Sequence, residues 1–151
     1  MLLMRLDASA PGDMPAIQTL LLDAGLPVVG VADAFRTGIV ARDDADILIG
    51  AAAVEPYGSV GLLRSVVVRP DRRGTGVGRA LVSAIEARAQ ALDVRELFLL
   101  TEAAAVWFAR LGYSPMERST LPAAIRASDE NTVACSVSAV ALARALGSPR
   151  R

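Results

Sequence analysis

The stretch that decides the fold of this chain is SVVVRPDRRGTGVGRAL, residues 65–81. An apolar, β-branched run ends at Pro70, and three glycines then alternate with other residues in a segment rich in arginine. From Leu81 onward apolar residues recur at steps of three and four, which is the spacing of a helix with one buried face. The stretch therefore predicts a strand, then a glycine loop, then the N-terminus of a helix.

A loop of this composition is suited to an anion. The N–H groups at a helix N-terminus point outward, and the helix dipole favours negative charge there. Gly74, Gly76 and Gly78 would let a phosphate approach the backbone without meeting a Cβ atom. The four arginines that add positive charge are Arg69, Arg72, Arg73 and Arg79. We therefore expect a diphosphate ligand, since an ordinary turn would leave the arginines and the preceding strand unexplained.

Two common phosphate loops do not fit. The P-loop pattern needs a lysine and the chain has none, and the three glycines form G-x-G-x-G rather than the dinucleotide pattern G-x-G-x-x-G. The pattern [Q/R]-x-x-G-x-[G/A] does fit, read as Arg73, Gly76 and Gly78. It resembles the pyrophosphate loop of the Gcn5-related N-acetyltransferases, which bind acetyl-coenzyme A.

Composition excludes several kinds of site. The chain has no histidine, which removes a Ser-His-Asp triad, a Cys-His pair, a histidine zinc site and an imidazole base. Its one cysteine, Cys135, excludes an internal disulfide and is expected to be a buried structural thiol. A net charge of zero gives no overall field that would attract nucleic acid. No metal site is expected.

At 151 residues the chain is expected to form one domain, residues 1–151. No apolar run reaches the roughly 18 residues of a membrane helix, and the first residues lack the pattern of a signal peptide. We therefore expect a cytoplasmic protein with a small-molecule partner, no nucleic acid or membrane partner, and a homodimer as an open alternative to the monomer.

The pattern of elements predicts an α/β fold. It is a mixed, mostly antiparallel central sheet with one parallel pair and helices on both faces. The parallel pair is expected between 63–68 and 96–101, joined by a right-handed crossover. The strand that carries 63–68 is expected to span 60–68 and to form an antiparallel hairpin with 47–55 through a turn at 56–59. The other expected strands are 1–7, 38–42, 113–118 and 138–144, and residues 43–46 are expected to form a solvated hairpin tip. The expected helices are one capped by Asp13 and stopped at Gly25, then 78–92 and 103–111, with one turn at 122–127 and a short helix or loop at 28–35. The tail after Gly147 is expected to fray.

A second motif supports the same family. Residues 105–113, AVWFARLGY, resemble the segment that follows the fifth strand in those acetyltransferases. Within the superfamily, residues 55–65, 108–113 and 121–126 are similar to the arsenic-resistance N-acetyltransferases. Better understood relatives of that family acetylate the amine of amino-acid toxins such as phosphinothricin and arsinothricin.

The resemblance implies which residues hold the cofactor. The backbone of Val66, Val67 and Val68 would pair with the pantetheine arm, and N–H groups around Val66 and Val67 would bind the acyl oxygen. The loop residues expected at the pyrophosphate are Arg73, Gly74, Thr75, Gly76, Val77, Gly78 and Arg79. Relatives often have an asparagine where this chain has Thr101 and a tyrosine where it has Phe108. A thiol with a pKa of about 8.5 can leave unaided near neutral pH.

Glu55 is the candidate base, since it ends an apolar strand and faces the strand that carries Arg64. Tyr57 and an ordered water chain are rivals, and a plain surface glutamate is the structural alternative. Arg64 is a charge within an apolar strand and therefore needs a partner. It would bind a carboxylate or phosphinate of the substrate, or form an internal ion pair for which Glu55 is the candidate partner. The residues expected at the substrate are Tyr57, Arg64 and Ser65, with Arg126 a weaker candidate.

The sequence thus favours acetyl transfer from acetyl-coenzyme A to the primary amine of a small molecule, with amino-acid-like toxins as candidate acceptors. Two alternatives stay open: a peptide N-acetyltransferase, and a non-catalytic acetyl-coenzyme A binder. The second is motivated by Phe108 and Thr101, because relatives place an acid and an amide there. Tyr113 is expected to be a core or rim aromatic rather than a replacement acid.

Overall fold

The computed structural model describes residues 4–128, 131 and 137–147 and contains one seven-stranded sheet with the strand order β1-β2-β3-β4-β5-β7-β6. The strands are β1 (Met4–Ala8), β2 (Ile39–Asp43), β3 (Leu48–Tyr57), β4 (Val60–Val68), β5 (Glu96–Thr101), β6 (Ser114–Met116) and β7 (Val140–Ala145). Every neighbouring pair is antiparallel except β4 and β5. The predicted fold class is therefore confirmed, while Cys135 and the tail after Gly147 lie outside the described residues.

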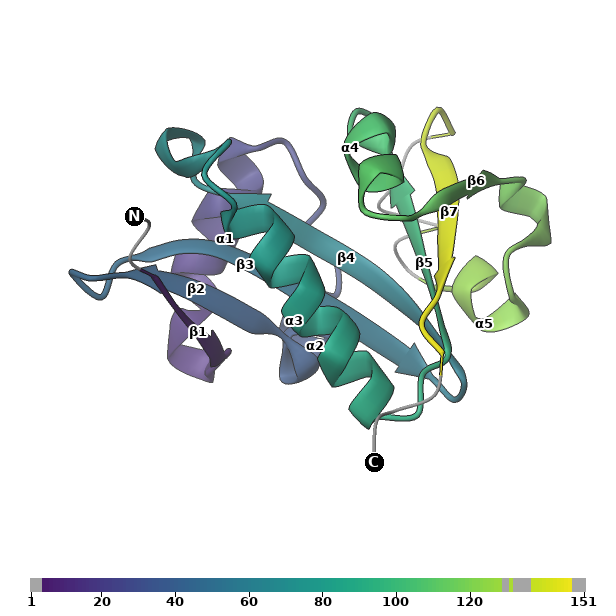
Figure 1. The fold of residues 1–151 in the computed structure, drawn as a ribbon, viewed down its shortest axis with the longest axis horizontal. Helices are drawn as coiled ribbons and strands as arrows, with labels where there is room; N and C mark the ends of the chain where they lie inside the picture. Colours follow the sequence, from purple (N-terminus) through teal and green to yellow (C-terminus); the bar gives the residue numbers. More distant parts are fainter. Residues whose placement is uncertain (1–3, 129–130, 132–136, 148–151) are drawn as a thin grey trace.

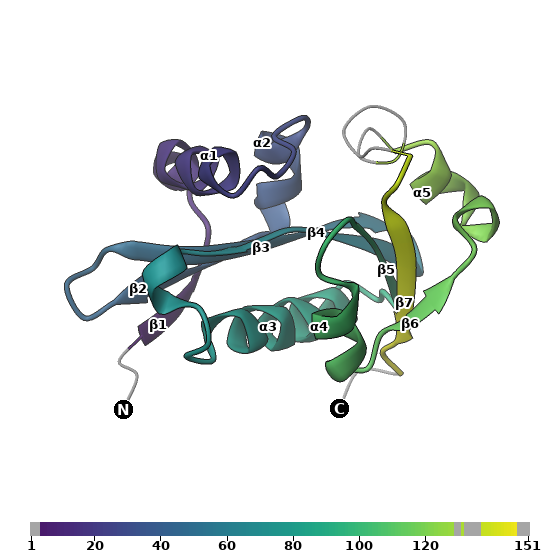
Figure 2. The ribbon, with the colours of Figure 1, turned by 90° about the horizontal axis from the view of Figure 1, so that it is seen from above.

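Helices cover both faces of the sheet, as Figures 1 and 2 show. The helices are α1 (Met14–Asp23), α2 (Val31–Ala34), α3 (Val77–Ala91), α4 (Ala105–Arg110) and α5 (Ala123–Arg126). Short 3₁₀ turns lie at Pro11–Asp13, Phe35–Thr37, Pro70–Arg72 and Arg118–Thr120. Helices α1 and α2 lie on one face, and α3 and α4 on the other (Figure 2). None of the helices in the described ranges is long and apolar enough to cross a membrane.

The parallel pair has a different register from the predicted one. We expected 63–68 to pair with 96–101, but the structure pairs Val60–Leu62 with Glu96–Phe98. Beyond Leu62 the two strands separate, and in Figure 2 the half of the sheet with β5, β7 and β6 turns away from the half with β1 to β4. The sheet thus opens between β4 and β5 at the end where β4 leads into the glycine loop.

A bulge in β4 explains the divergence. The register of β3 against β4 shifts between Ala51 and Ala53, which pair with Val67 and Arg64. At this point β4 has one residue more than β3, and Ser65 there has a φ of 58°, in the left-handed region. A bulge of this kind bends its strand and increases the local twist. The sequence carries no glycine at this position that would have indicated it.

The hydrophobic core has a layer on each face of the sheet. The predicted apolar face of α3 is buried against the sheet; its members are Val77, Leu81, Val82, Ile85 and Ala89. On the other face, Ile17 and Leu21 of α1 pack over the sheet with Phe35. A third cluster joins α5 to β4 and β5 through Ile125, Leu62 and other residues. Both faces of β3 and β4 are therefore covered, which suits their nearly continuous apolar sequence.

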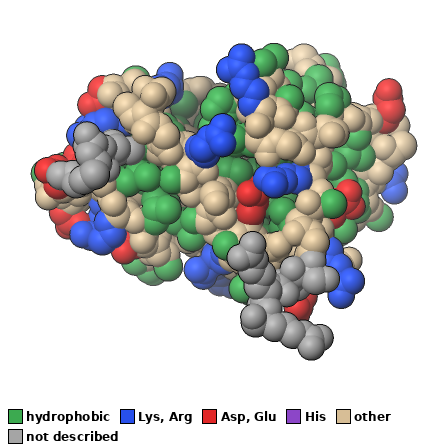
Figure 3. Space-filling model, in the orientation of Figure 1, with side chains coloured by type: hydrophobic (Ala, Val, Ile, Leu, Met, Phe, Trp, Pro, Cys, Tyr) green, Lys and Arg blue, Asp and Glu red, His purple; other side chains and the backbone are tan. Residues whose placement is uncertain are grey.

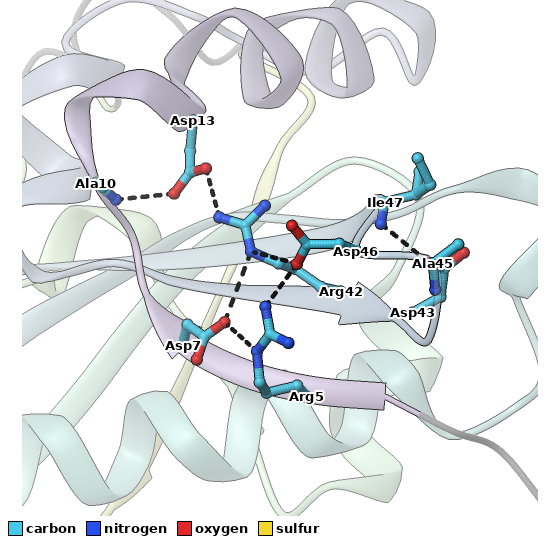
Figure 4. A network of polar contacts seen from close by, with 9 residues as sticks. All are labelled: Arg5, Asp7, Ala10, Asp13, Arg42, Asp43, Ala45, Asp46 and Ile47. Atoms are coloured by element: carbon cyan, nitrogen blue, oxygen red, sulfur yellow. Dashed lines mark hydrogen bonds and ion pairs between the residues drawn. The ribbon is translucent and has the colours of Figure 1, made fainter.

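Asp13 begins α1 at the predicted position but does not cap it. Its carboxylate accepts a hydrogen bond from the Ala10 N–H group (2.9 Å) and one from Arg42 (2.5 Å), so the predicted capping role is wrong. Figure 4 shows that Arg42 lies within an ionic network at the open edge of the sheet, with Arg5 and Asp7 close by. Burial raises the pKa of Asp13, but hydrogen bonds from Arg42 and Ala10 outweigh it and leave the pKa below its usual value.

Candidate functional site

The glycine loop runs from the end of β4 to α3 and is shaped by two glycines. Gly74 has a φ of 76° and Gly76 a φ of 94°, and Gly76 is the residue that precedes α3. Other residues adopt these angles only at a cost, which accounts for glycine at both positions. A Cβ atom at either glycine would meet nothing within 4 Å, so the space in front of the loop is open. The predicted sequence of strand, glycine loop and helix N-terminus is confirmed.

The four arginines near the loop differ in their partners. Arg69 pairs with Asp71 (2.6 Å), and Arg72 pairs with Asp43 (3.3 Å). Arg73 donates to the carbonyl group of Val68 (3.2 Å) and is exposed. In the part of the chain that the structure describes, neither Arg73 nor Arg79 has a carboxylate partner. These two therefore keep their charge available for an anion at the loop. Figure 3 shows charged side chains of both signs scattered over this face of the molecule, in agreement with the net charge of zero.

Asp43 was expected at a solvated hairpin tip, and for this residue the expectation is wrong. Its side chain is 7% exposed, and its Oδ1 atom accepts hydrogen bonds from the N–H groups of Ala45 and Ile47, each at 2.9 Å. Those bonds, that of Ile47 first, lower the pKa of Asp43. The carboxylate also binds Arg72, so it ties the hairpin between β2 and β3 to the glycine loop. No group of potential metal ligands occurs within the described ranges.

A cavity of about 320 Å³ lies where β4 and β5 separate. It is lined by residues 24–27, 63–66 and 99–104 and by Phe108, so it lies between the loop after α1, the two strands and α4. Val66 and Val68 pack their half-buried side chains toward α3, and Val67 packs toward α1. The backbone of these three valines is not paired with β5 in the described residues, because pairing ends at Leu62. The edge of β4 that the sequence analysis assigned to a ligand is therefore free of its neighbouring strand.

Thr101 and Phe108 both line this cavity. The Thr101 Oγ1 atom accepts a hydrogen bond from the N–H group of Ala104 (3.0 Å), which places it at the start of α4. Phe108 is 7% exposed, and its ring packs edge-on against Trp107 (4.8 Å between centroids) and Tyr113 (5.7 Å). The ring that replaces the usual tyrosine is thus held in place by two other aromatic rings.

Tyr113 is a core residue, as expected. It is 2% exposed, and its hydroxyl group donates to Glu86 at 2.8 Å. Arg144 donates to the same carboxylate oxygen, also at 2.8 Å. Burial, followed by the charge of Glu86, raises the pKa of Tyr113 far above its usual value. A phenol held in this way on the carboxylate of Glu86 is not available as an acid for the cavity.

The predicted acceptor residues form one polar cluster. Glu55 accepts a hydrogen bond from the Tyr57 hydroxyl group at Oε1 (2.6 Å) and one from Arg64 Nη1 at Oε2 (2.9 Å). Arg64 Nε in turn donates to the Ser65 hydroxyl group at 3.3 Å. The Arg64 side chain is 0% exposed and that of Glu55 is 18% exposed. The structure thus contains the internal ion pair that the sequence left open, and a direct contact of Arg64 with a substrate stays a prediction.

This cluster joins two cavities. Arg64 and Ser65 line the cavity between β4 and β5, whereas Glu55 and Tyr57 line a second one of about 370 Å³ beside α2 and α5. The ion pair between Glu55 and Arg64 therefore forms part of the wall between them. Arg126 lies exposed on α5 and lines neither cavity.

Sequence reasoning missed three features of the site. They are the bulge at Ser65, the bond from Arg72 to Asp43, and a contact between Trp107 and Gly78. Each depends on the placement of elements that are distant in sequence. Only Asp43 carried a local signal, because an aspartate that begins a tight turn often accepts the N–H groups of that turn.

Comparison with known proteins agrees with this geometry. An amino-acid acetyltransferase from Azotobacter vinelandii is 44% identical over 88 residues, which are 57% of this chain and 20% of that protein. The chain thus spans about a fifth of the length of the curated relatives that it matches.

Solved structures share the fold. N-acetylglutamate synthase from Neisseria gonorrhoeae, in complex with coenzyme A and N-acetyl-glutamate, superposes with a TM-score of 0.82 at 21% identity, over 97% of this chain and 36% of that one. A GNAT family N-acetyltransferase from Escherichia coli, in complex with coenzyme A, gives 0.69 at 20% identity, over 97% of this chain and 83% of that one. The description of the family whose model matches residues 35–115, more than half of the chain, is acetyltransferase (GNAT) domain. The chain therefore belongs to the GNAT acetyltransferase family, as its glycine loop indicated.

Proposed function

We propose that this chain transfers an acetyl group from acetyl-coenzyme A to the primary amine of a small molecule, with amino acids as the first class to test. The family supports the type of reaction. A curated relative is named an amino-acid acetyltransferase, and two solved structures of this fold hold coenzyme A. The acceptor of this chain is part of the proposal, since the match covers a fifth of that relative.

The residues at the loop fit a diphosphate. The open space at Gly74 and Gly76, the N–H groups at the start of α3 and the charges of Arg73 and Arg79 all suit one. Acetyl-coenzyme A supplies the acetyl group as a thioester, which an amine can attack without further activation. The loop would hold its diphosphate, and the free edge of β4 would hold its arm.

The observation that carries the proposal is the separation of β4 from β5 after Leu62. It leaves the edge of β4 beyond Leu62 without a neighbouring strand, and Val66 on that part of β4 lines the cavity, on the side that leads to the glycine loop. N–H groups of Val66 and Val67 would donate to the acyl oxygen as that oxygen gains negative charge. A strand paired throughout with β5 could not do this, because its N–H groups would already be used.

We assign Glu55 the role of base. The amine must lose a proton before or during its attack, and Glu55 is bound directly to Arg64, which lines the cavity. Arg64 and Tyr57 hold both of its oxygens in fixed positions. Each carboxylate oxygen retains a second lone pair, so Glu55 can accept the proton directly or from a water molecule.

The thiolate would leave without a phenol. Phe108 has no proton to give, and the hydroxyl group of Tyr113 is bound to Glu86. A thiol with a pKa of about 8.5 is a sufficient leaving group near neutral pH. As the C–N bond forms and the C–S bond breaks, the amine proton passes to Glu55 and the thiolate takes a proton from water.

The acceptor can be narrowed by experiment. The resemblance to arsenic-resistance N-acetyltransferases implies amino-acid toxins such as phosphinothricin and arsinothricin, and the curated relative implies ordinary amino acids. The carboxylate or phosphinate of such an acceptor would bind Arg64 only by displacing Glu55 from the ion pair, because the Arg64 guanidinium is fully buried.

Release of free thiol from acetyl-coenzyme A, measured with a panel of amines, tests the function. The panel holds amino acids, phosphinothricin, arsinothricin, simple amines and short peptides. We expect saturable release with at least one small amine and none in the Gly76→Asp variant. Binding of acetyl-coenzyme A in calorimetry without release for any amine would favour the non-catalytic binder instead, which the lack of a phenol at position 108 motivates.

A further inference from the structure

Trp107, the only tryptophan of the chain, reaches from α4 to the first turn of α3. A Cβ atom at Gly78 would lie 3.0 Å from Cζ2 and 3.3 Å from Cη2 of Trp107. The six-membered ring of the indole therefore lies close to the backbone of Gly78, and a methyl group there would be in tighter contact than is usual unless the ring or the helix shifted by a few tenths of an ångström. Gly78 needs no left-handed conformation, since it is the second residue of α3, so this close contact is what favours glycine there.

The contact lies between the two ends of the site. Gly78 follows Gly76 and Val77, whose N–H groups lie at the start of α3, next to the glycine loop. Trp107 is followed by Phe108, whose ring packs against it and lines the cavity between β4 and β5. One short helix, α4, thus touches both the diphosphate end and the acyl end of the site.

We propose that Trp107 is a positioning residue that holds the first turn of α3 against α4 and so sets the direction of the N–H groups toward the diphosphate. The proposal rests on the proposed binding of acetyl-coenzyme A. The loop pattern allows glycine or alanine at position 78, and the contact with Trp107 favours glycine in this chain.

The reason is geometric. Hydrogen bonds weaken steeply as the donor turns away from the acceptor, and several N–H groups must converge on one diphosphate. A methyl group at position 78 would force the indole or the first turn of α3 to move by a few tenths of an ångström. Phenylalanine at position 107 lacks the ring atoms that contact Gly78, so it would relieve the clash while keeping an aromatic side chain on α4.

The test is a double-mutant cycle of Gly78→Ala and Trp107→Phe. The dissociation constant of acetyl-coenzyme A is measured by calorimetry, and the free energy of unfolding by urea. We expect Gly78→Ala to weaken binding about tenfold, the loss of one good hydrogen bond, and Trp107→Phe to weaken it about threefold. In the Trp107→Phe background, Gly78→Ala should cost little further affinity. If Gly78→Ala folds only together with Trp107→Phe, the clash itself is established and the affinity of Trp107→Phe alone decides the proposal.

Two controls match the size of each change. Gly12→Ala adds a methyl group that meets nothing within 4 Å, and Val106→Ala trims a neighbour on α4 that is 68% exposed. Both should bind acetyl-coenzyme A as the wild-type protein does. S-acetyl-pantetheine, which lacks the diphosphate, separates positioning from packing, because its KM should not change in Gly78→Ala.

Two results would overturn the proposal. If the two positions interact in the free energy of unfolding but every variant keeps the wild-type dissociation constant, Trp107 is a packing residue only. If the KM of S-acetyl-pantetheine rises as much as that of acetyl-coenzyme A, the effect does not act through the diphosphate. A wild-type protein that binds no acetyl-coenzyme A would overturn the proposed function, and this proposal with it.

Discussion

The glycine loop and the acceptor cluster are built on opposite principles. The loop offers backbone N–H groups at Gly76 and Val77, and the space in front of it is open. The acceptor cluster consists of side chains that bind one another, with Glu55 held by Tyr57 and Arg64. The loop is therefore shaped for its ligand before the ligand arrives. The side chains of the acceptor cluster already bind one another, and a substrate must fit beside them or exchange partners with them.

This difference has a consequence for substitution. A backbone site tolerates changes in most side chains and fails when the backbone angles change. A closed side-chain network fails when any one member is removed, because its partner is left without a bond in a buried place. Substitutions in the loop and in the acceptor cluster test each half of that contrast.

The largest effect is expected at the loop from Gly76→Asp. The new residue must adopt a φ of 94°, and it places a negative charge where the diphosphate binds. Together these should weaken acetyl-coenzyme A binding by about 10³-fold in calorimetry, or about 4 kcal/mol. Gly76→Ala, in which alanine must adopt the same φ angle but adds no charge, should lose less affinity. An unchanged dissociation constant in Gly76→Asp would show that the loop assignment is wrong.

In the acceptor cluster the largest effect should come from Arg64→Leu. It removes a fully buried partner of Glu55 and should lower the free energy of unfolding by about 3 kcal/mol, the lower end for a broken buried pair because Glu55 is partly exposed. Arg36→Leu is the control, since Arg36 pairs with Asp33 on the open surface and should lose less than about 1 kcal/mol. Equal losses in the two variants would mean that the buried ion pair contributes no more to the free energy of unfolding than an exposed one.

Glu55→Gln tests the chemistry of the same cluster without changing its volume. The amide oxygen can still accept from Arg64, and the amide group can donate to the Tyr57 hydroxyl group, so the fold should hold. We expect kcat to fall about 10²-fold at neutral pH, and less at high pH where the amine is already deprotonated. A variant with wild-type kcat from about pH 6 to about pH 9 would remove Glu55 from the mechanism.

Asp43→Asn tests whether the bond between Asp43 and Arg72 of the glycine loop contributes to stability. The amide oxygen still accepts from Ala45 and Ile47, so only the charge opposite Arg72 is lost. Because the pKa of Asp43 is lower in the folded protein, its contribution to stability is complete above about pH 4 and is lost as the pH falls through the folded pKa. The wild-type advantage in urea midpoint should therefore be small at neutral pH and vanish in acid. An advantage that persists in acid would point to a role other than charge.

The same contrast governs what could be predicted from the sequence. The loop depends on adjacent residues, namely the β-branched strand and then Gly74, Gly76 and Gly78, and it was predicted in type and place. The opening of the sheet was not predicted. It depends on a serine in the left-handed region, and serine as a residue type gives no indication of that conformation. Without the bulge at Ser65, the natural expectation was a parallel pairing of 63–68 with 96–101.

The acceptor cluster was predicted as a set of residues but not as an arrangement. Arg64 of β4 pairs with Ala53 of the neighbouring strand β3. Glu55 lies two residues after Ala53 in β3, so Arg64 and Glu55 are on the same face of the sheet. That register was within reach of the sequence, and so the ion pair was one of its two alternatives. The contact between Trp107 and Gly78 was out of reach, because it depends on how α3 and α4 are placed relative to each other.

The smallest effect is expected from Phe108→Tyr, which restores the phenol that relatives often have. Phe108 lines the cavity and its ring is held edge-on between Trp107 and Tyr113. The ring of the new tyrosine is of the same size and should occupy the same place. If the thiolate leaves unaided, kcat should change by no more than about threefold, because an acid gives about 10²–10⁴-fold only where proton transfer limits the reaction. Tyr113→Phe is the control, since it removes a hydroxyl group bound to Glu86 and should lower stability but not kcat. A gain of about 10²-fold in Phe108→Tyr would show that the chain lacks an acid that it needs. The backbone loop would then be intact beside an incomplete catalytic side, and a protein that binds acetyl-coenzyme A without turning it over would become the better account.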